Sequence, residues 1–189
     1  MTTGFPSFRE KHGPGRIVAP PVPDRAMLER YRGRLPESLL EEWELGGLGG
    51  YMDGFLWLTD PSRLAHATQE WGLGASAVAF ARTAFGDLLF WDGEAVRCLF
   101  VHEGMVQHLP GDLPWLFEHS FCDESFLEDV LDLALFRLAL ERLGPPASDE
   151  MYTFVPALVL GGEERVENLK KVKMREQLLL LSQLHRRDA

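Results

Sequence analysis

The stretch AVAFARTAFGDLLFWDGEAVRCLFVHEGMVQHL, residues 77–109, determines the fold class of this chain. It contains four runs of aliphatic and aromatic residues of strand length, and short Gly-Asp, Asp-Gly and Glu-Gly turns separate them. Turns this short join antiparallel neighbours, because parallel strands need a crossover connection. We therefore predict an antiparallel meander drawn mainly from residues 75–109, with a further turn and short strand in YMDGFLWLTD at 51–60.

Helical patterns flank this stretch on both sides. Asp24 is a typical cap for one helix before it, Pro36 is a typical first-turn residue of a second, and Asp60-Pro61 begins a third. After it, the apolar run at 123–144 predicts one long buried helix. The expected helices cover residues 24–34, 36–46, 61–71, 124–143 and 174–185. A strand at 151–162, interrupted by Pro156, should lie in or beside the meander. The predicted fold is therefore α+β, an antiparallel meander packed with helices from the N-terminal and C-terminal regions.

Charge and hydropathy limit the function classes. The 189 residues carry a formal charge of −10, which argues against direct nucleic-acid binding, because that needs clustered Lys and Arg. It is compatible with a basic protein partner. No apolar run approaches the ~20 residues that span a bilayer, and the first residues lack an apolar signal core. We therefore expect a cytoplasmic protein without membrane contact, in which Cys98 and Cys122 stay reduced.

Acidic residues concentrate in one segment. Between Arg97 and Arg137 the sequence has no Lys or Arg but eight acids. These are Glu103, Asp112, Glu118, Asp123, Glu124, Glu128, Asp129 and Asp132. One interpretation is a solvated acidic face packed near the basic C-terminal segment 165–187. The other is a recognition surface for a basic partner.

Motifs that carry chemistry are weak. His119 and Cys122 are three residues apart, but a metal site needs three or four converging ligands, so ordinary surface histidines are the better interpretation. GLGASA at 72–77 follows a helix and leads into a strand, the reverse of a dinucleotide-binding turn. Asp53 with Asp60, or Asp87 with Asp92, are conceivable acid–base pairs, but Asp also favours turns. We expect no catalytic residue, metal site or cofactor, and we expect all five tryptophans, Trp43, Trp57, Trp71, Trp91 and Trp115, in the core.

The order of several short motifs is more informative than any one of them. FxxFxxxxG spans residues 5–13, and VPDRAMLERYRGRLPESLLEEWELGG spans residues 22–47. YMDG at 51–54, ARTAFGDLLFW at 81–91 and YTFVPALVLGG at 152–162 follow. In this order the chain resembles the GAD-like proteins of bacterial type VI secretion immunity. The segment LPxxLxxWxxGG is also similar to the broader Smi1/Knr4-like superfamily.

The resemblance implies an immunity protein that binds a cognate toxin, expected to be a basic nuclease, and occludes its active site. It implies a GAD-like region at 1–118 and a smaller C-terminal helical region at 119–189, with one strand block, sharing the core. The alternative is a non-catalytic regulatory or scaffold protein of the Smi1/Knr4 type. No contact residue can be transferred from the family by motif. The acid-rich segment suggests Glu118, Asp123, Glu124, Glu128, Asp129 and Asp132 as the partner-binding set, with Glu41, Glu42 and Glu44 as the alternative set.

Overall fold

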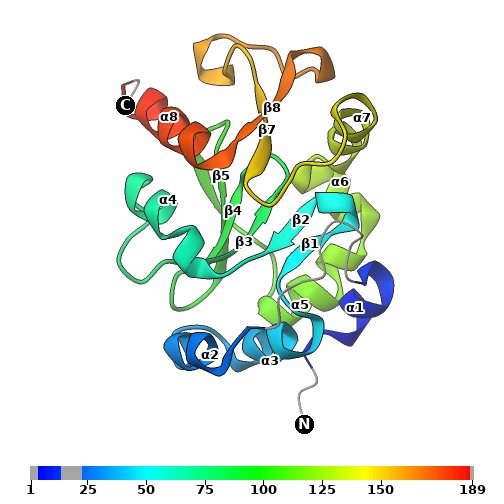
Figure 1. Ribbon diagram of the computed structural model, residues 1–189, viewed down its shortest axis with the longest axis vertical. Helices are drawn as coiled ribbons and strands as arrows, with labels where there is room; N and C mark the ends of the chain where they lie inside the picture. Colours follow the sequence, from blue (N-terminus) through cyan, green and yellow to red (C-terminus); the bar gives the residue numbers. More distant parts are fainter. Residues whose placement is uncertain (1–3, 14–22, 188–189) are drawn as a thin grey trace.

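The computed structural model describes residues 4–13 and 23–187 and has an α+β fold (Figure 1). Its described strands form a six-stranded sheet in the order β1-β2-β3-β4-β5-β6 and a two-stranded sheet, β7-β8. The strands are β1 Gly49–Tyr51, β2 Leu56–Leu58, β3 Val78–Thr83, β4 Leu88–Trp91, β5 Val96–Phe100, β6 Met105–His108, β7 Glu150–Phe154 and β8 Leu169–Lys173. The α-helices are α1 Pro6–His12, α2 Arg25–Tyr31, α3 Glu37–Gly46, α4 Ala65–Glu70, α5 Leu113–Glu118, α6 Glu124–Leu131, α7 Leu133–Leu143 and α8 Met174–Arg187. The predicted fold class is confirmed.

The six-stranded sheet is the predicted meander, since each strand pairs antiparallel with the next one along the chain. Its turns use the expected residue types. Asp92 closes the β4–β5 turn, where its Oδ1 accepts hydrogen bonds from the backbone N–H groups of Glu94 and Ala95, both at 2.9 Å. A bulge between Ala79 and Ala81 shifts the register of β3 against β4.

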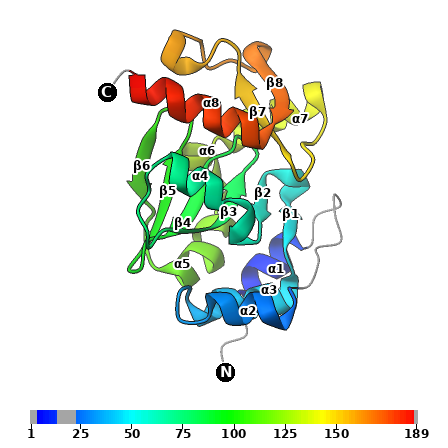
Figure 2. The same cartoon turned by 60° about the vertical axis from the view of Figure 1, so that its left-hand side comes forward.

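Both faces of the meander are covered from β1 to β5, and this explains why these strands are apolar almost throughout, whereas all four residues of the edge strand β6 are exposed. Successive side chains of a strand point to opposite faces. Leu89 and Cys98 belong to the larger hydrophobic core, which the helices α1, α3, α5 and α7 share. Leu88 and Leu99 belong to a second core with α4 and α8, which lie side by side over that face (Figure 2). None of the described helices is long and apolar enough to cross a bilayer.

The N-terminal helix α1 is held by aromatic packing. Phe5, which precedes α1, stacks on Phe117 of α5 with ring centroids 4.3 Å apart. Phe8 is fully buried and contacts Phe117 edge-on at 5.1 Å. Asp24 caps α2 as predicted, because its side chain accepts a hydrogen bond from the backbone N–H of Met27 at 2.8 Å. A seven-residue helix such as α1 does not persist alone, so its docking depends on these contacts.

The single long helix predicted at 124–143 is wrong. The chain forms two helices, α6 and α7, because Asp132 between them adopts the left-handed conformation with φ 60° and ψ 40°. Aspartate tolerates this conformation better than most residues, but an α-helix cannot continue through it. The expected all-round burial is also wrong, since the side chain of Leu138 is 51% exposed.

The C-terminal strand lies beside the meander without joining it. β7 pairs with β8, a strand that the sequence did not predict, and their junction with the meander includes a hydrogen bond from the N–H of Tyr152 to the carbonyl of Ala84 at 2.8 Å. β7 ends before the cis bond between Val155 and Pro156, so the predicted strand at 151–162 is shortened. The helix predicted at 174–185 is confirmed as α8.

The tryptophans divide between core and surface. Trp43 and Trp57 are buried, as predicted, and Trp71 and Trp91 are half-buried. The prediction is wrong for Trp115, which is 53% exposed on α5 and packs against the ring of His119 at 4.1 Å.

Candidate functional site

The predicted acidic partner-binding residues lie along one continuous segment, from the end of α5 to the junction of α6 and α7. We call this set the acidic surface. Asp123, Glu124, Glu128, Asp129 and Asp132 are exposed, and Glu118 is half-buried. Asp123 also has a structural role, because it caps α6 by accepting a hydrogen bond from the N–H of Ser125 at 3.0 Å. Glu118 accepts hydrogen bonds from both the hydroxyl and the N–H of Ser7 and so fastens α1.

The fold gives part of this surface a cation that the sequence pattern did not anticipate. Arg137 of α7 reaches back across α6 and forms ion pairs with Glu124 and Glu128, the latter at 3.1 Å. All three side chains are exposed, so each pair contributes little to stability. They nevertheless lower the net negative charge of the surface. Asp129 and Asp132 have no such pair within residues 4–13 and 23–187.

The alternative set does not form one surface. Glu44 is exposed and Glu41 is half-buried, but Glu42 is fully buried. One oxygen of Glu42 accepts a hydrogen bond from the N–H of Phe5 at 2.7 Å and pairs with Arg9. Burial raises the pKa of Glu42. Glu42 is therefore an internal anchor for the N-terminal segment, and its place in the alternative partner-binding set is wrong.

The histidine and cysteine candidates do not converge. The thiol of Cys122 donates to the carbonyl of Phe117, and the ring of His119 packs on Trp115. Within the described residues, no group of three or more His, Cys, Asp or Glu side chains is arranged to hold a metal ion. His102 lies apart from His119 and Cys122. It is buried beside the carbonyl of Phe85, and burial lowers its pKa to about 4.

The aspartate pair Asp87 and Asp92 also resolves into local structure. Asp87 is buried, accepts hydrogen bonds from the hydroxyl of Thr83 at 2.6 Å and from the N–H of Val101 at 3.1 Å, and has a pKa raised by burial to about 6. Asp92 instead forms an ion pair with Arg97. Asp87 therefore joins the ends of β3 and β5, and Asp92 closes the β4–β5 turn.

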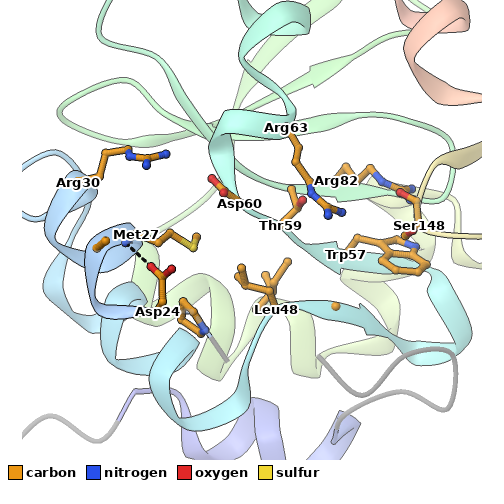
Figure 3. Close-up of a pocket in the computed structure, with 14 residues that line it drawn as sticks. Asp24, Met27, Arg30, Leu48, Trp57, Thr59, Asp60, Arg63, Arg82 and Ser148 are labelled. Carbon is orange, nitrogen blue, oxygen red and sulfur yellow. Dashed lines mark hydrogen bonds between the residues drawn. The ribbon is translucent and has the colours of Figure 1, made fainter. Parts of the chain in front are cut away.

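A cleft that the sequence did not reveal lies between α2, the β1–β2 edge of the meander and the loop before β7 (Figure 3). Its volume is about 560 Å³, within the range of ligand-binding clefts. Apolar parts of the wall come from Met27, Leu48, Leu58 and Trp57. Its charged lining residues are Asp24, Arg30, Asp60, Arg63 and Arg82. These residues are spread over almost sixty positions of the chain, so no local motif marks the cleft.

Arg82 is the most unusual residue of the cleft, because its side chain is charged and only 1% exposed. Its guanidinium lies over the ring of Trp57, 4.8 Å from the ring centroid. It donates hydrogen bonds to the carbonyls of Thr83, Ala147 and Ser148 at 3.1, 3.3 and 3.1 Å. Burial lowers the pKa of Arg82 to about 9. Neutral carbonyls hold this cation in place, and the exposed carboxylate of Asp149 offsets its charge only in part.

Two family models and a crystal structure are similar to this chain. A family model described as the GAD-like domain matches residues 8–103, and one described as the C-terminal part of the type VI secretion immunity protein Tdi1 matches residues 116–185. The crystal structure of Atu4351 from Agrobacterium tumefaciens has a similar fold, with a TM-score of 0.76 and 21% sequence identity. The similarity covers 93% of this chain and 86% of that one. No curated protein gave a significant match.

Proposed function

Since the chain belongs to the GAD-like family of type VI secretion immunity proteins, as its motifs predicted, we propose that it binds one cognate toxin effector and neutralises it by occluding the toxin's active site. The observation that carries this proposal is the match of residues 116–185 to an immunity-protein domain, beside the GAD-like match that precedes it. We further propose that the protein acts in the cytoplasm, without catalysis and without a cofactor. The division into regions 1–118 and 119–189 is retained as part of this proposal.

The acidic surface supports a nuclease as the toxin. A nuclease must attract nucleic acid, so its groove is basic, and an acidic inhibitor can occupy that groove. Asp129 and Asp132 are available for such contacts, and Glu124 and Glu128 can exchange Arg137 for a cation of the toxin. The alternative partner-binding set now contains only Glu41 and Glu44, because Glu42 is buried.

Charge reversal tests this surface. Asp123 is left unchanged because it caps α6, and the test variant is Glu124→Lys with Glu128→Lys and Asp129→Lys. The control is Glu94→Lys with Glu167→Lys and Glu176→Lys, which are exposed elsewhere and change the net charge equally. The partner is the product of the adjacent gene, and both association rate and nuclease inhibition are measured over a range of salt concentrations. Electrostatic steering weakens over a Debye length of about 10 Å at 0.1 M salt, so we expect the wild-type rate to fall steeply with salt.

The two variants separate the outcomes. We expect the test variant to associate at least about tenfold more slowly than the control, with a flatter salt dependence. Equal rates for the two variants would place the contact surface elsewhere, with Glu41 and Glu44 examined next. Binding of the wild type without inhibition of the toxin would favour the regulatory or scaffold alternative.

A further inference from the structure

The cleft in Figure 3 concentrates positive charge on a protein that carries −10 overall. Three arginines line it, Arg30, Arg63 and Arg82, against two aspartates. The aspartates already accept hydrogen bonds. Asp24 Oδ1 accepts from the N–H of Met27 at 2.8 Å, and Asp60 Oδ1 accepts from the N–H of Ser62 at 2.9 Å and from the hydroxyl of Tyr31 at 3.1 Å.

The arginines lack matching carboxylates. None of the ion pairs within residues 4–13 and 23–187 involves Arg30, Arg63 or Arg82. For the exposed Arg30 and Arg63, water solvates the charge. Arg82 is nearly inaccessible to water, and a buried charge is costly unless a charge of opposite sign accompanies it. The nearest such charge is the exposed carboxylate of Asp149, which forms no ion pair with Arg82 and is paired with Lys173 at 2.7 Å. Three hydrogen bonds to carbonyls leave two of its five N–H donors for another acceptor.

We propose that this cleft receives an Asp or Glu side chain from an extended acidic segment of the toxin. The inference rests on the proposed function, because it assumes that a toxin is bound. A carboxylate supplies the single negative charge that the lining lacks, since three arginines and two aspartates leave a net charge of +1. A phosphate carries more charge and would be repelled by Asp24 and Asp60.

Shape and composition agree with a peptide ligand. The volume of about 560 Å³ is larger than one acidic side chain, so neighbouring residues of the segment can pack on Met27, Leu48 and Leu58. Arginine presents a planar fork that pairs with both oxygens of a carboxylate, and Arg and Trp are the residue types most enriched at energetic centres of interfaces. Arg82, fixed on Trp57, is a pre-organised hydrogen-bond donor for such a carboxylate.

The first experiment uses the isolated protein and a small probe. N-acetyl-glutamate is titrated into the ¹⁵N-labelled chain at constant ionic strength, and the indole N–H of Trp57 and the Nε–H of Arg82 are followed by NMR. N-acetyl-glutamine is the neutral control, and inorganic phosphate is a competing anion. We expect saturable shifts with the acid, and at least tenfold weaker binding of the amide and of phosphate. Equal binding of acid and amide, or tighter binding of phosphate, would overturn the proposal.

The second experiment uses the toxin, again the product of the adjacent gene. Arg30→Gln with Arg63→Gln removes two exposed cations without disturbing the buried Arg82, and Arg175→Gln on α8 is the control. We expect the double variant to bind the toxin about tenfold more weakly and the control to bind normally. Normal binding by the double variant would refute the role of the cleft while leaving the proposed function intact. Absence of binding by the wild type would refute the proposed function, and the NMR titration would still decide whether the cleft takes a carboxylate.

Discussion

Replacement of Glu42 by alanine should destabilise the fold strongly, although a glutamate on a helix with an exposed polar face is normally replaceable. Glu42 is 0% exposed, and its carboxylate accepts a hydrogen bond from the N–H of Phe5 at 2.7 Å and pairs with Arg9. Its removal leaves a buried N–H group without an acceptor and takes a carboxylate away from Arg9. Phe5 and Phe8 then lose the contact that fastens their segment to α3.

The magnitude follows from these two losses. A buried donor without a partner costs about 1–3 kcal/mol, and breaking a buried ion pair at one side costs about 3–5 kcal/mol. The side chain of Arg9 is 25% exposed, so water solvates its charge and lowers the cost of breaking the ion pair. We therefore expect Glu42→Ala to lower the free energy of unfolding by about 3 kcal/mol. For a chain of this size, that corresponds to a fall in Tm of roughly 6–12 °C.

Urea denaturation of the wild type, Glu42→Ala, Glu42→Gln and Glu44→Ala measures this effect. Glu44 is exposed on the same helix, so its replacement should change the free energy of unfolding by no more than about 0.5 kcal/mol. Glu42→Gln keeps an oxygen for the N–H of Phe5 and should fall between the two alanine variants. If Glu42→Ala and Glu44→Ala prove equally stable, the carboxylate of Glu42 does not anchor the N-terminal segment and our reasoning is wrong.

Three further predictions concern stability. Burial lowers the pKa of His102 from 6.5 to about 4. The folded protein therefore loses free energy of unfolding as the pH falls from 6.5 toward 4, because the unfolded chain binds the proton first. The loss is at most about 3 kcal/mol, at 1.36 kcal/mol per pKa unit. His102→Gln should therefore lose less stability than the wild type between pH 7 and pH 5 in urea titrations, whereas identical pH profiles would exclude this role. Asp132→Ala should be about 1 kcal/mol less stable than Asp132→Gly, because only glycine adopts φ 60° without strain, and an equal Tm for both variants would contradict this. Phe8→Ala should cost about 3–5 kcal/mol and expose α1 to limited proteolysis, and a loss below 1 kcal/mol would show that α1 is dispensable.

The sequence was informative where local chemistry determines structure. The meander followed from short, continuous apolar runs and from turn residues such as Asp92, whose side chain does accept the hydrogen bonds of its turn. The cap at Asp24 was likewise predictable from residue type. The break at Asp132 was not, because the flanking apolar pattern continues through it and a single left-handed residue leaves no periodic signal. β8 was missed because three of its five residues are lysines, which suit the exposed face of an edge pair but are untypical of strands.

The candidate sites depended more on tertiary structure. A count of charges along the chain indicated the acidic surface but could not show that Arg137 returns to Glu124 and Glu128. Glu42 has the same local context as Glu41 and Glu44, and only the docking of Phe5 and Arg9 distinguishes it. The cleft around Arg82 joins residues from α2 to the loop before β7. The sequence did contain one signal for this cleft, which is Arg82 inside the apolar strand 78–83. A buried arginine needs hydrogen-bond acceptors, and other segments of the chain must supply them.

The most direct test of the central claim is protection of living cells. The product of the adjacent gene is expressed in bacteria with this chain, with an equally expressed Trp43→Asp variant whose core is disrupted, or alone. We predict that the toxin alone stops growth and degrades cellular nucleic acid, and that the intact chain restores growth while forming a stoichiometric complex with the toxin. Continued toxicity in the presence of folded, equally abundant protein would contradict the proposal that this chain neutralises that toxin by binding it.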